Sequence, residues 1–276
     1  MSVRLAITGA TGRMGRELIA EASDREDAEV VLAVNRDPDG DEVDGVEVAD
    51  AADFAALVAE REPNAVVDFT GPESSVEYVE AAADAGVPAV VGTTGFSDDQ
   101  IDALRAASEE APVLKAANFA RGVQALLDVV GDAVANLPGY DVELVETHHD
   151  AKRDAPSGTA KSILREVEDA RSEAAASDNR AAEPRDGIGE DEDRRVHGRE
   201  GEAPREAGDI GVHAVRAGDV TGEHEVIVAG NHEEVRLTHR AESRGVFAAG
   251  AVDAAVWIAQ QEYGWYDFGD VLEESA

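Results

Sequence analysis

The chain has 276 residues, enough for one large domain or two smaller ones, and its 60 acidic and 24 basic side chains give a formal net charge of −36. This charge argues against nucleic acids and anionic membranes as partners, because both are bound through positive charge, and no apolar run approaches the length of a membrane span. The absence of cysteine excludes disulfides, thiolate catalysis and cysteine-ligated metal, and the seven histidines show no metal-ligand spacing, so no metal is expected.

Strand-like and helix-like segments alternate through the first half of the chain. Val3–Thr8 has the pattern of a buried strand, and the segment around it lacks the apolar core and cleavage site of a signal peptide, so we expect a cytoplasmic protein. This alternation predicts a doubly wound parallel sheet of the Rossmann type, with helices on both faces. Further strands are expected at Glu29–Val34, Ala65–Phe69, Pro88–Val91 and Val113–Lys115, and helices at segments such as Phe54–Arg61 and Val76–Ala85.

A glycine-rich turn joins the first strand to a helix predicted over Arg13–Ala22. Its sequence, GATGRMG, places glycine at positions 9, 12 and 15, a variant of the phosphate-binding fingerprint. Glycine lets the backbone approach a pyrophosphate, which the amides at the start of the following helix attract. Such a turn can also serve only as a connection, but its place at the first strand-to-helix junction favours a nucleotide.

The end of the second strand bears on the choice of cofactor. An acid at this point favours the ribose hydroxyls of NAD, whereas an arginine favours the 2′-phosphate of NADP. Here Val34 and Asn35 lead into Arg36, with no acid, and Arg13 is a second available cation. The pattern therefore favours NADPH, with NADH still possible; the alternative for Arg36 is a solvated side chain.

The second half has a different pattern. A helix over Arg121–Ala135, a strand over Asp141–Thr147 and a helix from about Gly158 to Arg171 precede closely spaced β-type segments, which predict a smaller α+β domain with a mixed or antiparallel sheet. The acidic segment Ser172–Arg195 is expected to be a solvated loop. The β-type segments are Asp209–Arg216, His224–Ala229 and Glu234–Arg240, and an apolar helix is expected over Gly245–Gln261.

A local excess of basic side chains lies in this second half, within and next to the stretch ETHHDAKRDAPSGTA from Glu146 to Ala160. Between Thr147 and Lys161, three basic residues stand against two acidic ones. The chain has only three lysines, and two of them, Lys152 and Lys161, lie in or next to this stretch. His148 and His149 add groups that titrate near neutral pH. The stretch therefore suits protonation and binding of a small anion, although an isolated pair of histidines is more often part of a surface turn.

Six motifs in a fixed order resemble the dihydrodipicolinate reductase family of diaminopimelate and lysine biosynthesis, over nearly the whole chain. Besides the stretch above, they are GATGRMGRELI at 9–19, DFTGPE at 68–73, VVGTTGF at 90–96, AANFARGV at 116–123 and GREGEAPREAGDIGVHAVRAGDVTGEHEV at 198–226. The resemblance implies NAD(P)H-dependent reduction of 4-hydroxy-tetrahydrodipicolinate to tetrahydrodipicolinate with loss of water. It also implies a dinucleotide-binding domain at 1–120 and 244–276, and a substrate-binding and oligomerisation domain at 121–243.

The same resemblance assigns roles to single residues. It implies that His148 donates the proton and that Lys152 is a second proton-donating or carboxylate-binding group. It implies that His149, Gly158 and Thr159 contact the substrate, which would be a small dicarboxylate. It also implies that the protein assembles as a homotetramer. The implied cofactor contacts are Gly9, Ala10, Thr11, Gly12, Arg13, Met14, Arg36, Gly92, Thr93, Thr94, Ala116, Ala117, Asn118 and Phe119.

The chain departs from the family pattern at Asn35, where an acid is usual, and at Ala151, where histidine is frequent. Two other functions are compatible with parts of the sequence: another NAD(P)-dependent oxidoreductase of small carbonyl or imine substrates, and a non-catalytic nucleotide-sensing module. The large acidic excess with few lysines indicates adaptation to a high-salt cytoplasm, where self-repulsion of the charges is screened.

Overall fold

The computed structural model of the chain describes residues 2–38, 40–177 and 194–273. The chain divides into two compact units. Unit 1 comprises Met1–Arg121 and Arg244–Ala276, and unit 2 comprises Gly122–Ser243. The first border lies one residue beyond the expected one, and the second coincides with it. None of the helices in these described ranges is both long enough and apolar enough to cross a membrane.

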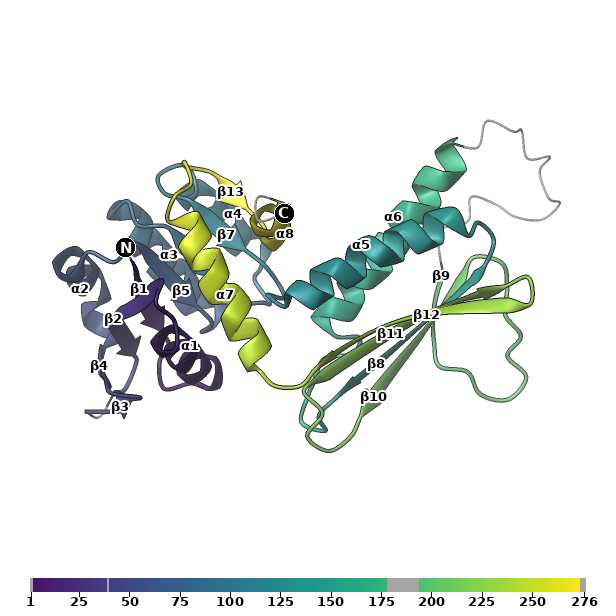
Figure 1. The fold of residues 1–276 in the computed structure, drawn as a ribbon, viewed down its shortest axis with the longest axis horizontal. Helices are drawn as coiled ribbons and strands as arrows, with labels where there is room; N and C mark the ends of the chain where they lie inside the picture. The colour runs from purple at the N-terminus through teal and green to yellow at the C-terminus, as the bar shows by residue number, and fades with distance from the viewer. Residues whose placement is uncertain (1, 39, 178–193, 274–276) are drawn as a thin grey trace. The chain divides into compact units, whose positions relative to one another are not determined.

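Unit 1 is built on an eight-stranded sheet in the order β13-β7-β6-β5-β1-β2-β4-β3 (Figure 1). Every neighbouring pair is parallel except β3 and β4, so the predicted doubly wound sheet is confirmed. The order reverses beside β1, which places a topological switch point between β1 and β5. The strands are β1 (Val3–Thr8), β2 (Ala28–Asn35), β3 (Glu42–Val43), β4 (Val46–Asp50), β5 (Ala65–Asp68), β6 (Ala89–Val91), β7 (Val113–Lys115) and β13 (Trp265–Tyr266).

Helices cover both faces of this sheet because its strands are apolar on both sides. In β1, Leu5 and Ile7 enter one core, whereas Ala6 enters the core on the other face, as the twofold alternation of a strand requires. The connecting helices are α1 (Arg13–Ser23), α2 (Phe54–Arg61) after a short 3₁₀ turn at Ala51–Asp53, α3 (Pro72–Asp84) and α4 (Asp98–Ala107). Helix α3 begins four residues before its predicted start, because Pro72 occupies its first turn, where proline is favoured.

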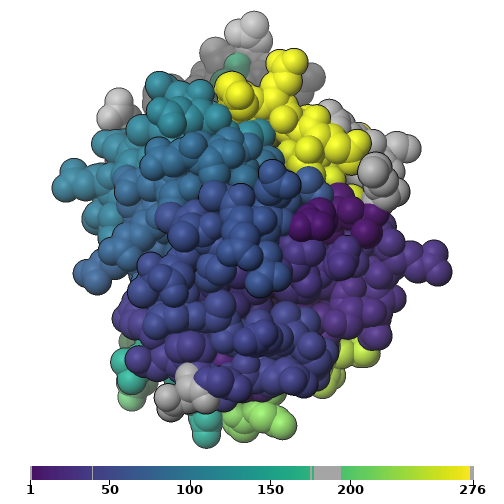
Figure 2. Space-filling model, turned by 90° about the vertical axis from the view of Figure 1, so that its left-hand side faces the viewer, coloured from purple at the N-terminus to yellow at the C-terminus, as the bar shows by residue number. Residues whose placement is uncertain are grey.

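The C-terminal segment completes unit 1. Helix α7 (Gly245–Ile258) packs its alanines and valines against β1, β5, β6, β7 and α1, and α8 (Phe268–Glu273) packs beside it. Figure 2 shows this segment, in yellow, packed among the N-terminal parts of unit 1. Asp253 of α7 accepts hydrogen bonds from Arg25 at 2.7 Å and Arg121 at 2.9 Å, so ion pairs fix the returning helix to both earlier segments.

Unit 2 contains a five-stranded mixed sheet in the order β12-β11-β8-β10-β9, which confirms the predicted α+β part. Strand β8 is parallel to β10 and antiparallel to β11. Two helices, α5 (Arg121–Asn136) and α6 (Gly158–Ser177), lie side by side over one face (Figure 1), where Val142, Leu144 and Val226 enter their core. The strands are β8 (Asp141–His148), β9 (Arg194–His197), β10 (Asp209–Arg216), β11 (Gly222–Gly230) and β12 (Glu233–Ala241).

The acidic segment Ser172–Arg195 is not a loop throughout. Its first residues continue α6 as far as Ser177, and Arg194 and Arg195 begin β9; residues 178–193 lie outside the described part of the chain. The prediction was wrong here because acidic composition is not by itself a sign of loop structure. Buried Val167 and Ala170 continue the apolar stripe of α6, and Arg195 pairs with Glu168 of that helix at 2.6 Å.

Candidate active site

The turn between β1 and α1 forms a close-packed cradle. Gly9 has a φ of +65°, and the amide of Gly12 donates to the Gly9 carbonyl at 2.9 Å. A Cβ on Gly15 would lie 2.3 Å from that carbonyl oxygen, so only glycine fits there. Gly12 caps α1 without a side chain, and the first turn carries no acidic residue. These features fit a bound pyrophosphate, because the helix start presents amides and a positive dipole end.

A buried carboxylate ties three strand ends together beside this turn. Asp68, fully buried at the end of β5, accepts hydrogen bonds of 2.6 Å from the hydroxyls of Thr8, Thr70 and Thr93. These threonines follow or end β1, β5 and β6. Thr93 is one of the predicted cofactor contacts, but its hydroxyl is engaged with Asp68. Asp68 therefore holds the loops that carry the predicted cofactor contacts.

The other predicted cofactor residues follow strands at the same edge of the unit 1 sheet. Arg36 directly follows β2, and its guanidinium donates to the hydroxyl of Ser74 in α3. Thr94 and Ala117 are exposed there, after β6 and β7. Phe119 differs, because its ring is buried between Phe69 and Phe268, with centroids 5.5 and 5.3 Å away. Phe119 can therefore offer a cofactor only its main chain.

In unit 2, His148 is the last residue of β8 and is largely buried. Its Nδ1 lies 2.6 Å from Oε2 of Glu146, which faces the same side of the strand two residues earlier and is fully buried. Arg216 of β10 donates two hydrogen bonds of 2.8 Å to the two oxygens of Glu146, and the amide of Ser157 donates a third at 3.1 Å. A polar cluster thus anchors the imidazole through its Nδ1 atom.

The pKa values in this cluster follow from burial and these contacts. Burial would raise the pKa of Glu146, but the hydrogen bonds from Arg216 and His148 outweigh it, so the pKa lies below its usual value. For His148, burial lowers the pKa below the ordinary value, and the Glu146 carboxylate opposes this effect. Glu146 is therefore ionised at neutral pH, and burial favours the neutral form of His148 more than in a free histidine.

A second buried histidine packs against the first. The rings of His148 and His224 lie 5.2 Å apart, edge to face, and Nε2 of His224 is 2.9 Å from the hydroxyl of Ser157. Burial lowers the pKa of His224 to about 3, so this ring is neutral at any working pH. The same Ser157 hydroxyl accepts from the amide of Ala160 at 3.1 Å, which holds the first turn of α6.

The remaining predicted substrate residues lie in the loop and helix start that follow β8. Nζ of Lys152 is 2.8 Å from Oδ1 of Asp154, which holds the pKa of that carboxyl below its usual value against the effect of burial. His149 is partly exposed, directly after β8. Gly158 and Thr159 form the first turn of α6, where main-chain amides favour an anion. All five predicted residues thus lie between the end of β8 and the start of α6.

Four residues of this cluster were not predicted from the sequence: Glu146, Arg216, Ser157 and His224. Glu146 could have been found, because residues i and i+2 of a strand share a face and His148 was already a predicted site residue. Arg216 and His224 could not, since they reach His148 only through the pairing of β10 and β11 with β8.

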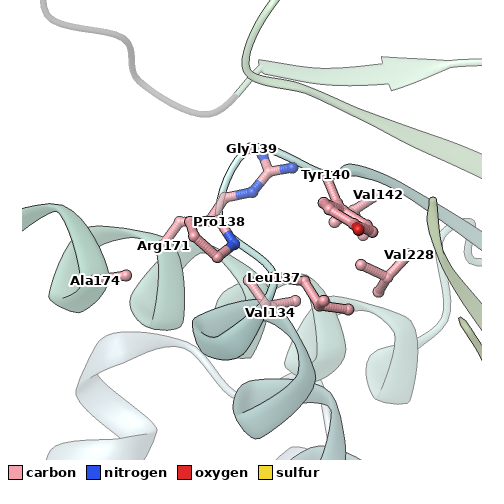
Figure 3. Close-up of a pocket in the computed structure, with 9 residues that line it drawn as sticks. All are labelled: Val134, Leu137, Pro138, Gly139, Tyr140, Val142, Arg171, Ala174 and Val228. Carbon is pink, nitrogen blue, oxygen red and sulfur yellow. The ribbon is translucent and has the colours of Figure 1, made fainter. Parts of the chain in front are cut away.

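A separate pocket in unit 2 involves none of these residues. It is lined by Val134, Leu137, Pro138, Gly139, Tyr140, Val142, Arg171, Ala174 and Val228 (Figure 3). Tyr140 directly precedes β8 and Val142 lies near its start, whereas His148 lies at its end, roughly 20 Å away for a strand of this length. The pocket is therefore distinct from the polar cluster around His148.

Two family models match almost the whole chain. One, described as dihydrodipicolinate reductase, N-terminus, matches residues 3–119, and the other, described as dihydrodipicolinate reductase, C-terminus, matches residues 122–272. The two matches meet where unit 1 passes into unit 2.

Similar proteins match nearly the full length of the chain. The 4-hydroxy-tetrahydrodipicolinate reductase of Natronomonas pharaonis is 52% identical over 270 residues, covering 98% of this chain and 100% of that protein. The reductase of the same name from Haloarcula marismortui is 48% identical, covering 98% and 99%. Among solved structures, a dipicolinate-bound dihydrodipicolinate reductase from Paenisporosarcina sp. TG-14 is similar with a TM-score of 0.74 and 25% identity, covering 97% and 98%.

Proposed function

Because the chain belongs to the dihydrodipicolinate reductase family, we propose that it reduces 4-hydroxy-tetrahydrodipicolinate to tetrahydrodipicolinate with NAD(P)H and loss of water, in the diaminopimelate route to L-lysine. The observation that carries the proposal is the environment of His148. A titratable imidazole ends β8, and Lys152 and the amide-rich start of α6 follow within a few residues. This arrangement suits a substrate with two carboxylates and one carbon to be protonated.

The reaction needs hydride at one carbon and a proton at its neighbour. When bound, NAD(P)H supplies the hydride that adds to C4 of the ring after water has left. His148 gives its Nε2 proton to the adjacent carbon, where the electron pair of the reduced double bond develops, and solvent then reprotonates the imidazole. Lys152 neutralises one carboxylate of the ring. Gly158 and Thr159 bind the other carboxylate at the helix start.

The residues of unit 1 would hold the dinucleotide. The Gly9–Gly15 turn would take the pyrophosphate, and the loops that Asp68 ties together would carry the remaining contacts. We further propose a preference for NADPH, supported by Arg36 after β2 and by Asn35 in the place where an acid would favour NADH.

We predict that Arg36→Ala raises the Michaelis constant for NADPH about tenfold, the lower end for a lost hydrogen bond to a charged group, because Arg36 is exposed. NADH lacks the 2′-phosphate and is the internal control. Steady-state kinetics with each cofactor in turn measures both constants. An equal rise for NADH shows that Arg36 does not recognise the 2′-phosphate.

We predict that Lys152→Ala lowers kcat/KM for the dicarboxylate by roughly 10- to 100-fold, because a charge-assisted contact to a carboxylate is lost. Lys161→Ala is the matched control, since Lys161 is exposed on α6 and belongs to the same basic stretch. Initial rates over a range of substrate concentrations give the comparison. If both variants lose activity equally, general charge and not Lys152 binds the substrate.

The reaction itself is tested by following oxidation of NADPH in molar salt with freshly prepared 4-hydroxy-tetrahydrodipicolinate. We expect oxidation that depends on both enzyme and substrate. Oxidation with other small imines or carbonyl compounds but not with this substrate indicates a different oxidoreductase. Binding of NADPH without any turnover indicates a nucleotide-sensing module.

We also propose a homotetramer in a high-salt cytoplasm. The sheet face of unit 2 opposite α5 and α6 supports the assembly, because Val145 and Ile227 are partly exposed there and Val215 is 41% exposed. The charge of −36, the three lysines and the relatives in halophilic archaea support the high-salt setting. High salt screens charges at long range, so short charge-assisted contacts must bind the substrate.

A further inference from the structure

We propose that Glu146 and Arg216 are positioning residues for His148. Glu146 selects the tautomer and the orientation of the imidazole ring, and Arg216 limits how strongly the Glu146 carboxylate stabilises the protonated ring. This inference rests on the proposed reduction, in which His148 is the proton donor. It concerns two residues that do not reach the substrate themselves but act through His148.

The tautomer follows from the hydrogen-bond chemistry of the carboxylate. Glu146 is fully buried and ionised, so it can only accept. The nitrogen that lies 2.6 Å from its Oε2 is Nδ1 of His148, which must therefore carry a hydrogen. Neutral His148 is then the Nδ1–H form, with a lone pair on Nε2. When Nε2 gains a proton, it becomes the only ring nitrogen free to give one to a substrate.

The residue next to Nε2 has no side chain. Gly222, at the start of β11, faces the ring, and a Cβ there would lie 3.2 Å from Nε2. On the other side of the ring, Nδ1 is fixed by Glu146, and His224 packs edge to face. The imidazole therefore has one anchored nitrogen and one nitrogen beside a residue without a side chain.

Arg216 balances the charge of Glu146. Its two 2.8 Å hydrogen bonds occupy both oxygens, and its guanidinium also donates to the main-chain oxygen of Asp154 at 2.6 Å. A buried carboxylate without this partner would stabilise the imidazolium strongly, and an acid that holds its proton too tightly transfers it slowly. Arg216 therefore keeps His148 able to release the proton.

The other charged and titratable groups around His148 favour its neutral form, are neutral themselves, or are paired with an opposite charge. Lys152, in the loop after β8, lowers the pKa of His148, as does Arg216, after the larger effect of burial. Asp154 of that loop is paired with Lys152 at 2.8 Å. His224 of β11 is neutral, because burial lowers its pKa to about 3. Glu146 is thus the group that favours the imidazolium, and Arg216 is the group that moderates it.

The test uses two variants whose effects on the pH dependence of kcat should be opposite. Glu146→Gln removes the charge that raises the pKa of His148, so the alkaline limb of the profile should move to lower pH, with kcat lower on the order of 10²-fold. Arg216→Gln leaves the Glu146 charge unbalanced, which raises the pKa of His148, so the alkaline limb of the kcat profile should move to higher pH. The Michaelis constant for NADPH should stay unchanged in both, since the cluster lies in unit 2.

Glu168→Gln is the matched control, because Glu168 forms a comparable two-bond pair with Arg195 in the same unit, at 2.6 Å for each bond. It should leave the pH profile unchanged. Shifts of both test variants in the same direction, or no shift in either, overturn the proposal.

A second measurement needs neither turnover nor a variant of Glu146. Two-dimensional nitrogen NMR of histidine-labelled enzyme, with His148 assigned from the spectrum of His148→Gln, reports which ring nitrogen carries the hydrogen. We expect the Nδ1–H form for neutral His148. A predominant Nε2–H form overturns the positioning role, whereas the Nδ1–H form in a protein without reductase activity means that the proposed function has failed and the positioning geometry has not.

Discussion

Replacement of His148 by glutamine should lower kcat by about 10²- to 10⁴-fold, the usual contribution of a general acid. Glutamine is close in size and keeps a donor that can reach Glu146, but it cannot release a proton to a developing carbanion. The polar cluster should survive, because Glu146 still accepts two hydrogen bonds from Arg216 and one from the amide of Ser157. The loss should therefore come from chemistry and not from unfolding.

Two measurements separate this result from a general defect. NADPH binding, followed by fluorescence titration, should be unaffected, since the glycine-rich turn belongs to unit 1. His197→Gln makes the same substitution at an exposed histidine of β9 and should retain wild-type turnover. Near-full turnover of the His148 variant would remove that residue from the proton transfer.

Substitution of Gly15 by alanine should destabilise the chain by about 3 kcal/mol and abolish NADPH binding. Helix propensity alone gives the opposite sign, because alanine inside a helix is favoured over glycine by about 1 kcal/mol. The steric effect is larger: the added Cβ would lie 2.3 Å from the Gly9 oxygen and 2.7 Å from the Ala10 Cα, both main-chain atoms that cannot rotate away. The turn must therefore move.

Urea unfolding at constant molar salt gives the free energy of unfolding of each variant. Gly71→Ala is the control, because Gly71 has extended backbone and no neighbouring atom lies within 4 Å of the place that the same added methyl group would take. We expect a change below about 1 kcal/mol for that control. Equal stability of the Gly15 variant and the wild type would mean that the turn can adapt, and the cradle would lose its steric basis.

The fold followed from periodicity because most of the segments are long and regular. Strand β1, helix α2 and strand β10 have the predicted bounds, since their apolar residues repeat with the period of the element. Short edge elements were missed, as at Glu42–Val43 and Trp265–Tyr266, because two residues cannot show a period. Their pairing partners, β4 and β7, decide their conformation.

For the candidate site, the limit of prediction was the distance along the chain between partners. His148, Lys152 and Gly158 lie within one short stretch and could be grouped directly. The contact of Arg216 with Glu146 spans 70 residues and depends on the register of β10 against β8. For Phe119, the position after a strand predicts a cofactor contact but does not reveal that the ring belongs to the core, which leaves only the main chain for that contact.

The division of unit 1 between two distant parts of the chain has a consequence during synthesis. Helix α7 leaves the ribosome only after roughly 120 further residues have been made, a delay of about 6–24 s at 5–20 residues/s. Until then, the sheet face of Leu5, Ile7 and Val67 lacks the cover of α7, whose Ala248, Val252 and Ile258 belong to the same core. The nascent nucleotide-binding half should therefore bind chaperones until its last helix emerges.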